Sequence, residues 1–289
     1  MERAKVNGVE LEYEVYGSGE PVVLLHGGLL PDENRPMAKE PGLTDHYKVI
    51  NYHRRGFAGS SKPEGRAQIG DQVADCRALL GHLGVEKVHV VGHSLGGVIG
   101  IQLALDAPEM VQDLVLMEPA IMGAVAKAES AGRPEAVESQ KQFRAGMERV
   151  QQIYASGDAR GALTAFLETR AGDAFREVLD FLTATGEFEQ AVRDAGTFLN
   201  VEMPAAYAWN FTRADAARLK APVLSILGAH SPIRAQKVHQ ILKEWVPQTE
   251  TLVLPNAEHA LALMDPPGIA AAVAGYLAQH PMSESAKVG

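Results

Sequence analysis

The first regular pattern along the chain is an alternation of apolar residues with three glutamates over residues 9–15. A period of two is typical of a strand with one buried and one solvated face, as at the antiparallel edge of a sheet. The dipeptide Asn7-Gly8 directly before it favours a tight turn. We therefore expect an antiparallel edge strand at this point.

Farther along, the pattern changes to short, continuous apolar runs separated by segments of helical periodicity. Continuous apolar runs are typical of parallel strands that are buried on both faces, with helices as crossovers. The expected strands lie near residues 22–25, 47–52, 88–91, 114–117, 222–227 and 251–254, and the expected helices at 67–83, 95–107, 233–245 and 267–278.

This alternation stops near Pro119 and resumes near residue 218. Between them only helical segments are found, at 137–155, 159–170 and 173–184. We therefore expect an α/β core formed by residues 1–119 and 218–289, interrupted by a helical cap over residues 120–217. Seven of the eight phenylalanines fall in the cap, either to give it a core of its own or to line an apolar pocket. These are Phe143, Phe166, Phe175, Phe181, Phe188, Phe198 and Phe211.

Composition narrows the possible functions. The 289 residues are 46% apolar and 22% charged, which is ordinary for a globular protein and excludes disorder as the main state. The net charge of −9 and the absence of a basic tract disfavour binding to nucleic acid or to an anionic membrane surface. No apolar run approaches the length of a membrane span, and the N-terminal residues lack the apolar stretch of a signal peptide. We therefore expect a cytoplasmic protein.

The single cysteine, Cys76, excludes an internal disulfide and a cysteine-based zinc site. Its position in the apolar stripe of the helix expected at 67–83 predicts a buried, inert thiol.

The sequence Gly92-His93-Ser94-Leu95-Gly96 follows the strand expected at 88–91 and opens the next helix. A sharp strand-to-helix turn strains its central residue and leaves little room beside it, which explains the two glycines. The turn lifts the hydroxyl of Ser94 above the end of the sheet and points the first N–H groups of the helix at an incoming oxyanion. Ser94 is therefore the candidate nucleophile.

A serine nucleophile needs a base, and His259 is the best placed of ten histidines. It lies in the loop between the last expected strand and the last helix. The carboxyl ends of parallel strands meet at one edge of a sheet, so His259 can meet Ser94 there. We expect His93 to point away from the nucleophile and His26 to be structural.

Four segments together resemble the α/β-hydrolase superfamily: residues 22–28, 52–60, 92–97 and 256–259. The resemblance covers nearly the whole chain and is least secure over residues 120–217, where that superfamily carries variable caps. It implies an eight-stranded, mostly parallel sheet with a helical lid. It also implies an oxyanion hole formed by the backbone N–H groups of Leu95 and Gly28. Serine at position 94 argues against the branches that use aspartate there, namely haloalkane dehalogenases and epoxide hydrolases.

The chain departs from that superfamily at the acid. The usual aspartate after the seventh strand is replaced by Ser231, which carries no charge and cannot stabilise an imidazolium. We expect Glu118 to substitute for it, because Glu118 ends the strand at 114–117, 24 residues after the nucleophile, and a carboxylate leaving an apolar strand needs a partner. Some superfamily members carry their acid after this sixth strand, including certain fungal lactonases. Asp265 is the weaker alternative.

No other chemistry competes with this site. The sequence has no nucleotide-binding glycine motif and no metalloprotease spacing, so no cofactor and no metal are indicated. The segment Arg54-Arg55-Gly56 is interpreted as a structural turn after the fourth strand. The sequence thus predicts a cofactor-free serine hydrolase that cleaves an ester or lactone of a medium-sized apolar small molecule. The alternatives are C–C hydrolysis, perhydrolysis or lyase chemistry at the same site, or a degenerate hydrolase that only binds a small molecule. The oligomeric state is not indicated.

Overall fold

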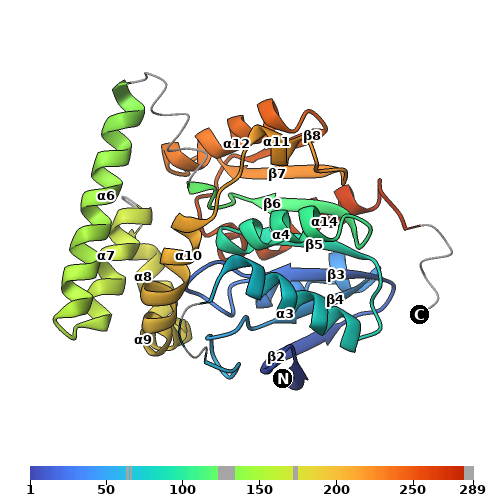
Figure 1. Ribbon diagram of the computed structural model, residues 1–289, viewed down its shortest axis with the longest axis horizontal. Coiled ribbons are helices and arrows are strands. Elements are labelled where there is room, and N and C mark those ends of the chain that lie inside the picture. Colours follow the sequence, from blue (N-terminus) through green and yellow to red (C-terminus); the bar gives the residue numbers. More distant parts are fainter. Residues whose placement is uncertain (63–64, 66, 123–133, 172–174, 283–289) are drawn as a thin grey trace.

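The apolar runs of the sequence form one eight-stranded sheet in a computed structural model of the protein (Figure 1). The structure describes residues 1–62, 65, 67–122, 134–171 and 175–282. The strands follow the order β1-β2-β4-β3-β5-β6-β7-β8. Their bounds are Glu2–Val6 for β1, Val9–Tyr16 for β2, Glu20–Leu25 for β3, Tyr47–Tyr52 for β4, Val88–His93 for β5, Val111–Met117 for β6, Val223–Gly228 for β7 and Thr249–Leu254 for β8.

The N-terminal edge of the sheet is antiparallel and the rest is parallel. Strand β2 pairs in antiparallel register with β1 and β4, whereas every later neighbouring pair is parallel. Residues 4, 11 and 13 of this edge are buried, while the glutamates of β2 are partly exposed. Both the edge strand and the mostly parallel sheet expected from the sequence are therefore confirmed.

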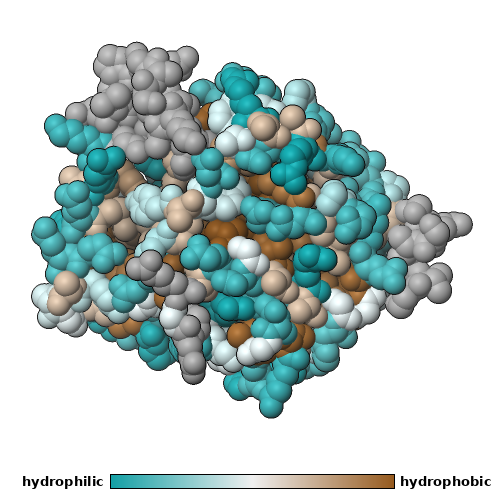
Figure 2. All heavy atoms as spheres, viewed as in Figure 1, coloured by the Kyte–Doolittle hydropathy of each residue, from teal (hydrophilic) through white to brown (hydrophobic). Residues whose placement is uncertain are grey.

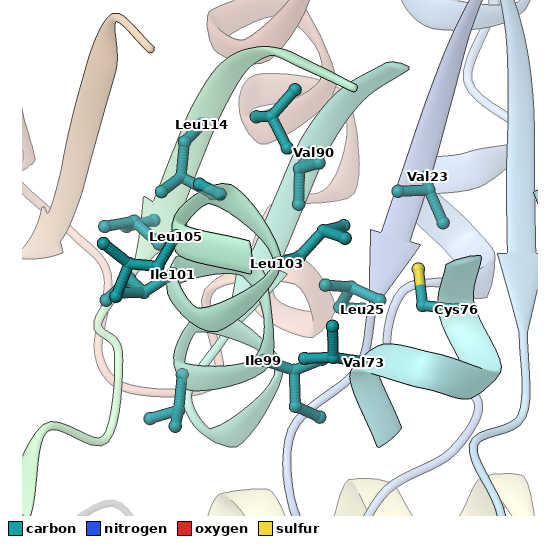
Figure 3. Packing of buried hydrophobic residues seen from close by; sticks show 14 of the residues in the cluster. Val23, Leu25, Val73, Cys76, Val90, Ile99, Ile101, Leu103, Leu105 and Leu114 are labelled. Atoms are coloured by element: carbon teal, nitrogen blue, oxygen red, sulfur yellow. The ribbon is translucent and has the colours of Figure 1, made fainter. Parts of the chain in front are cut away.

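Helices cover both faces of the sheet because the parallel strands are apolar on both sides. One face packs against α3 (Ile69–His82), α4 (Leu95–Asp106) and α12 (Ile233–Trp245). The other packs against α1 (Arg35–Ala38), α2 (Pro41–Thr44) and α14 (Pro266–Leu277). Cys76 points from α3 into the first of these cores beside Leu25 (Figure 3), and burial raises the pKa of its thiol to about 12. It is the buried thiol that the sequence predicts.

Between β6 and β7 the described residues are mostly helical, and most of these helices stand beside one end of the sheet, at the left of Figure 1. These helices enclose a third apolar core shared with loops after β3 and β4. The exact limits of the cap, expected at 120–217, stay a prediction, and residues 123–133 and 172–174 lie outside the described part. The helices are α6 (Pro134–Ala155), α7 (Ala159–Ala171), α8 (Phe175–Thr185), α9 (Glu187–Gly196), the π-helix η2 (Thr197–Glu202), α10 (Met203–Ala208) and α11 (Arg213–Ala216).

Polar contacts tie the cap to the turn after β4. The buried side chain of Arg54 forms an ion pair with the buried Glu202 of η2. Asp194 of α9 accepts hydrogen bonds from the backbone N–H of Ala58 and from Lys62. Arg54 also donates to the backbone carbonyl of His26, whose ring accepts from the Arg54 N–H. These contacts agree with the structural interpretation of this turn and of His26.

On the face shown in Figure 2, hydrophilic residues cover most of the surface, and hydrophobic residues are visible mainly near its middle. No helix among the described residues is both long enough and apolar enough to cross a membrane.

Candidate active site

The turn from β5 into α4 has the backbone strain that the sequence predicts. Ser94 has a φ of 50° and a ψ of −114°, which is uncommon for a residue other than glycine. A Cβ at Gly96 would lie 2.0 Å from the Leu25 carbonyl oxygen, and one at Gly92 would lie 2.6 Å from the Gly96 carbonyl oxygen. Only glycine fits at either position, so the sequence forces the tight elbow that presents Ser94 to the cavity.

Glu118 and His259 meet at the same edge of the sheet. The Nδ1–H of His259 donates to Glu118 Oε2 over 2.7 Å. Glu118 directly follows β6 and has a φ of 46°. The residue is buried, with 4% of its surface exposed. Two further donors hold the other carboxylate oxygen, Oε1: the backbone N–H of Gly228 at 2.8 Å and the hydroxyl of Ser231 at 2.5 Å. Ser231, at the position where an aspartate is usual, therefore donates a hydrogen bond to the candidate acid Glu118.

The alternative acid, Asp265, does not face the imidazole. Its side chain is exposed at the start of α14, where it accepts a hydrogen bond from the backbone N–H of Gly268. That is the behaviour of a helix N-cap.

The electrostatics of this pair favour a carboxylate beside a neutral imidazole. Burial opposes the charge on Glu118, but the contacts with His259, Ser231 and Gly228 outweigh it and lower its pKa to about 2. Burial and the positive charge of Arg170 lower the pKa of His259 to about 4, against the raising effect of Glu118. Since the carboxylate can only accept, Nδ1 of His259 carries the proton and Nε2 has the free lone pair.

The expected oxyanion donors face the same cavity as Ser94. Gly28 and Leu95 both line it, and neither backbone N–H donates a hydrogen bond within the described residues. The neighbouring Gly27 N–H is unsuitable for this task, because it donates to Glu33. Two unengaged N–H groups beside the hydroxyl are suited to hold a negatively charged oxygen.

Nε2 of His259 is not bonded to Ser94. It accepts a hydrogen bond from Arg170 Nη2 over 2.9 Å, and the Ser94 hydroxyl makes no hydrogen bond to any described residue. Arg170 comes from the cap helix α7. No sequence pattern singles out Arg170, since only the fold of the cap brings it to this edge of the sheet.

A second buried Glu–His pair, formed by Glu33 and His93, lines the same cavity as Ser94. His93 Nδ1 contacts Glu33 Oε1 at 2.7 Å, and its Nε2 donates to the backbone carbonyl of His259 at 2.8 Å. Burial opposes the charged ring, but Glu33 and the His259 carbonyl raise the pKa of His93 above its ordinary value. His93 was expected to point away from the nucleophile. Its ring makes no hydrogen bond to Ser94. It lies in the cavity wall and holds the loop that carries His259, a role that the sequence alone did not suggest.

The cavity above Ser94 encloses about 100 Å³ and is mostly apolar. Three cap phenylalanines, Phe143, Phe166 and Phe198, line it together with Leu29 and Met203. Phe188 instead packs in the core of the cap, and Phe211 stacks on Trp209 against the sheet. Each of the two interpretations of the aromatic cap is thus correct for some of the rings. Among the described residues, no cluster of three or more His, Cys, Asp or Glu side chains could hold a metal ion.

Comparison with known proteins agrees with this geometry. The sequence profile of the alpha/beta hydrolase fold matches residues 20–266. A putative carbamate hydrolase RutD from Azorhizobium caulinodans is 36% identical over 118 residues, which are 40% of this chain and 44% of that protein. A soluble epoxide hydrolase from Corynebacterium sp. is 35% identical over 119 residues, 40% of each chain. The matches thus span less than half the length of these relatives.

Solved structures resemble the fold over almost its full length. A thermophilic esterase from Thermogutta terrifontis has a TM-score of 0.77 at 21% identity, covering 98% of this chain and 100% of that one. The enol-lactonase from Burkholderia xenovorans LB400 has a TM-score of 0.74 at 21% identity, covering 96% and 100%. With the sheet order, the strained elbow and the profile match over most of its length, the chain belongs to the α/β-hydrolase fold family.

Proposed function

We propose that the protein is a cofactor-independent serine hydrolase that cleaves a carboxylic ester or lactone through an acyl-enzyme. The observation that carries the proposal is the 2.7 Å contact between His259 and the buried Glu118, beside the elbow that presents Ser94. A nucleophile, a base and a group that orients the base are the three parts that such chemistry needs.

In the proposed reaction, the Ser94 oxygen attacks the substrate carbonyl carbon while His259 Nε2 takes the hydroxyl proton. The resulting oxyanion accepts hydrogen bonds from the Gly28 and Leu95 N–H groups. When the bond to the leaving oxygen breaks, His259 returns the proton to that oxygen, and an acyl-serine ester remains. Water then attacks the acyl carbon and gives one proton to His259. As the bond between the acyl carbon and the Ser94 oxygen breaks, His259 passes that proton to the serine oxygen, which releases the acid and restores the free enzyme.

Glu118 contributes by its charge and its position. Its carboxylate holds the imidazole in the tautomer whose Nε2 can accept a proton, and it stabilises the imidazolium that forms. The missing aspartate at position 231 motivated the alternative of a degenerate binding protein. Since Glu118 lies within hydrogen-bond distance of His259, that departure no longer argues against catalysis.

The cavity supports a compact, largely apolar substrate rather than a sugar or a peptide. Its lining is mostly apolar and includes three phenylalanines of the cap, which suits an apolar acyl or alcohol part. The structural neighbours named as an esterase and an enol-lactonase agree with ester or lactone cleavage.

Hydrolysis of p-nitrophenyl acetate and butyrate by the purified protein tests the proposal. We expect turnover that is lost in Ser94→Ala, with an unchanged circular dichroism spectrum and melting temperature. If Ser94→Ala keeps the wild-type rate, Ser94 is not the nucleophile. If no ester or lactone is cleaved but a C–C bond substrate or peracid formation is supported, the reaction class is wrong although the site is right.

A further inference from the structure

Arg170 occupies the position that the nucleophile needs. Its Nη2–H donates to His259 Nε2 over 2.9 Å, while Nδ1 of the same ring donates to Glu118. A neutral imidazole with a proton on Nδ1 has one lone pair, on Nε2. Arg170 and the Ser94 hydroxyl therefore compete for the same acceptor, and the base is engaged while Arg170 stays there.

The charge of Arg170 also opposes catalysis. A cation beside the ring disfavours the imidazolium that must form when His259 takes the serine proton. Arg170 is among the causes that lower the pKa of His259 to about 4. Whatever draws this guanidinium away from Nε2 frees the lone pair and makes the imidazole a stronger base.

Arg170 has no carboxylate bonded to it in the part of the chain that the structure describes, and the negative charge that acts on it is that of Glu118, which is bonded to the opposite nitrogen of the His259 ring. Arg170 forms no ion pair with a carboxylate there, and its contacts are His259 and the face of the Phe143 ring, 5.9 Å from the guanidinium carbon. The guanidinium carbon of Arg234 lies 4.3 Å from the centroid of the same ring, and its positive charge repels that of Arg170. Burial and Arg234 lower the pKa of Arg170 to about 10, against the raising effect of Glu118 and Tyr207, so Arg170 is still protonated at neutral pH.

An arginine in a mostly apolar cavity is unfavourable without a carboxylate or phosphate, which the planar guanidinium binds through two parallel hydrogen bonds. The cavity that Arg170 lines also contains Ser94 and both oxyanion donors. Its missing partner would therefore arrive with the substrate, within a few bonds of the carbonyl that is attacked.

We infer that Arg170 is the recognition site for a carboxylate of the substrate, and that its transfer from His259 to that carboxylate releases the imidazole to activate Ser94. The substrate class is then a hemiester of a short dicarboxylic acid, or a lactone that bears a free carboxylate. This inference rests on the proposed serine hydrolase function. It adds a substrate class and the requirement that Arg170 leave His259 before the imidazole can act as the base. Arg170 stays protonated throughout and takes part in no bond-making step.

The contact with His259 limits how the substrate can sit. Because Arg170 reaches Nε2 from the cap, a bound carboxylate lies on the cap side of the imidazole, and the leaving group or acyl chain fills the apolar remainder near Phe166 and Phe198. A short spacer between carboxylate and ester is therefore expected to give the fastest substrate.

The test compares two phenyl esters of matched shape. The first is monophenyl glutarate, which carries a free carboxylate at the end of its acyl chain. The second keeps the phenyl ester but has a neutral primary amide in place of that carboxylate. We expect kcat/KM of the wild-type protein to favour the carboxylate substrate by about 100-fold, the effect typical of a hydrogen-bonded ion pair in a desolvated site. The related malonate, succinate and adipate monoesters then measure the preferred spacer length.

Three variants separate recognition from folding. Arg170→Gln should lose about 100-fold in kcat/KM on the carboxylate substrate, while its rate on the amide stays equal or rises because Nε2 is free. Arg170→Lys should retain part of the preference for the anion. The matched control is Arg160→Gln on the same helix. Arg160 is exposed, pairs with Glu189 and lies over the Phe188 ring, and it does not line the cavity, so this change is expected to leave the preference unchanged.

The outcomes distinguish this inference from the function on which it rests. If wild-type protein cleaves both esters through Ser94 without a preference, or Arg170→Gln loses both rates equally, carboxylate recognition is refuted and the serine hydrolase stands. If neither ester is cleaved and a fluorophosphonate does not label Ser94, the proposed function itself has failed. Calorimetry of the dianion glutarate with Ser94→Ala gives an independent check, because binding should weaken about 100-fold when Arg170→Gln is added.

Discussion

Replacing Glu118 with glutamine tests the unusual position of the acid. The carboxylate accepts from three donors: His259 Nδ1 on Oε2, and Gly228 N and Ser231 Oγ on Oε1. A glutamine keeps the contacts with Gly228 and Ser231 if its carbonyl oxygen faces them. The reverse orientation is unfavourable, because its NH₂ group would then face two other hydrogen-bond donors. In the favourable orientation, the NH₂ group faces His259.

An NH₂ group facing Nδ1 requires that nitrogen to accept, which moves the proton to Nε2 and displaces the Arg170 donor from Nε2. That nitrogen can no longer accept the serine proton, so we expect Glu118→Gln to reduce kcat by about 10⁴-fold, equivalent to about 5.4 kcal/mol of barrier. The measurement is p-nitrophenyl butyrate hydrolysis with the melting temperature followed in parallel. The fold should survive, because the change is nearly isosteric.

Two companion variants sharpen the result. Asp265→Asn removes the charge of the other candidate acid and should leave kcat within about twofold, since Asp265 only caps α14. Adding Ser231→Asp to Glu118→Gln returns a carboxylate to the position usual in the family, and it should recover about tenfold or more of the rate. A Glu118→Gln protein that stays within tenfold of wild type, with Asp265→Asn impaired, would refute the assignment.

Three further predictions follow from contacts elsewhere in the structure. On the acid side, kcat/KM should fall with an apparent pKa of about 4, well below the ordinary 6.5 of histidine, because neutral His259 is the active form and is lost as the pH drops through its lowered pKa. Arg170→Gln removes one cause of the lowered pKa and should move this fall to higher pH. A fall at an unchanged pH would contradict this cause. Arg54→Met removes the ion-pair partner of the buried Glu202 and should lower the free energy of unfolding in urea by about 3–5 kcal/mol. A loss below about 1 kcal/mol would show that this ion pair contributes little to stability. Gly96→Ala places a Cβ 2.0 Å from a backbone oxygen and should destabilise the protein by about 3 kcal/mol or more. The control is Gly81→Ala, whose Cβ meets nothing within 4 Å and which should leave the melting temperature unchanged or raise it. Equal effects of the two changes would refute the argument that only glycine fits at the turn before α4.

The fold was predictable because its signals are local. Continuous apolar runs, the alternation at 9–15 and the glycine pattern around Ser94 each fix one element, and the parallel order brings strand ends to one edge. For the same reason Ser94, Glu118 and His259 could be chosen before any coordinates: each stands at the end of a strand or in the loop after one.

The parts that escaped prediction depend on long-range packing. Arg170 reaches His259 only because α7 folds over the sheet, and a helix face does not reveal which neighbour it will meet. Glu33 lies in an irregular loop with no periodic signal, so its contact with His93 could not be anticipated. The same limit applies to the cap aromatics, whose division between the cavity and the cap core is set by how the helices cross rather than by their spacing.

The most direct measurement of the central claim is peptide mapping by mass spectrometry after treatment with a fluorophosphonate. The account predicts one adduct per chain, on Ser94, with no labelling of Ser94→Ala and slow labelling of Glu118→Gln. A wild-type protein that remains unmodified, or a Ser94→Ala variant that is labelled as readily as the wild type, would contradict it.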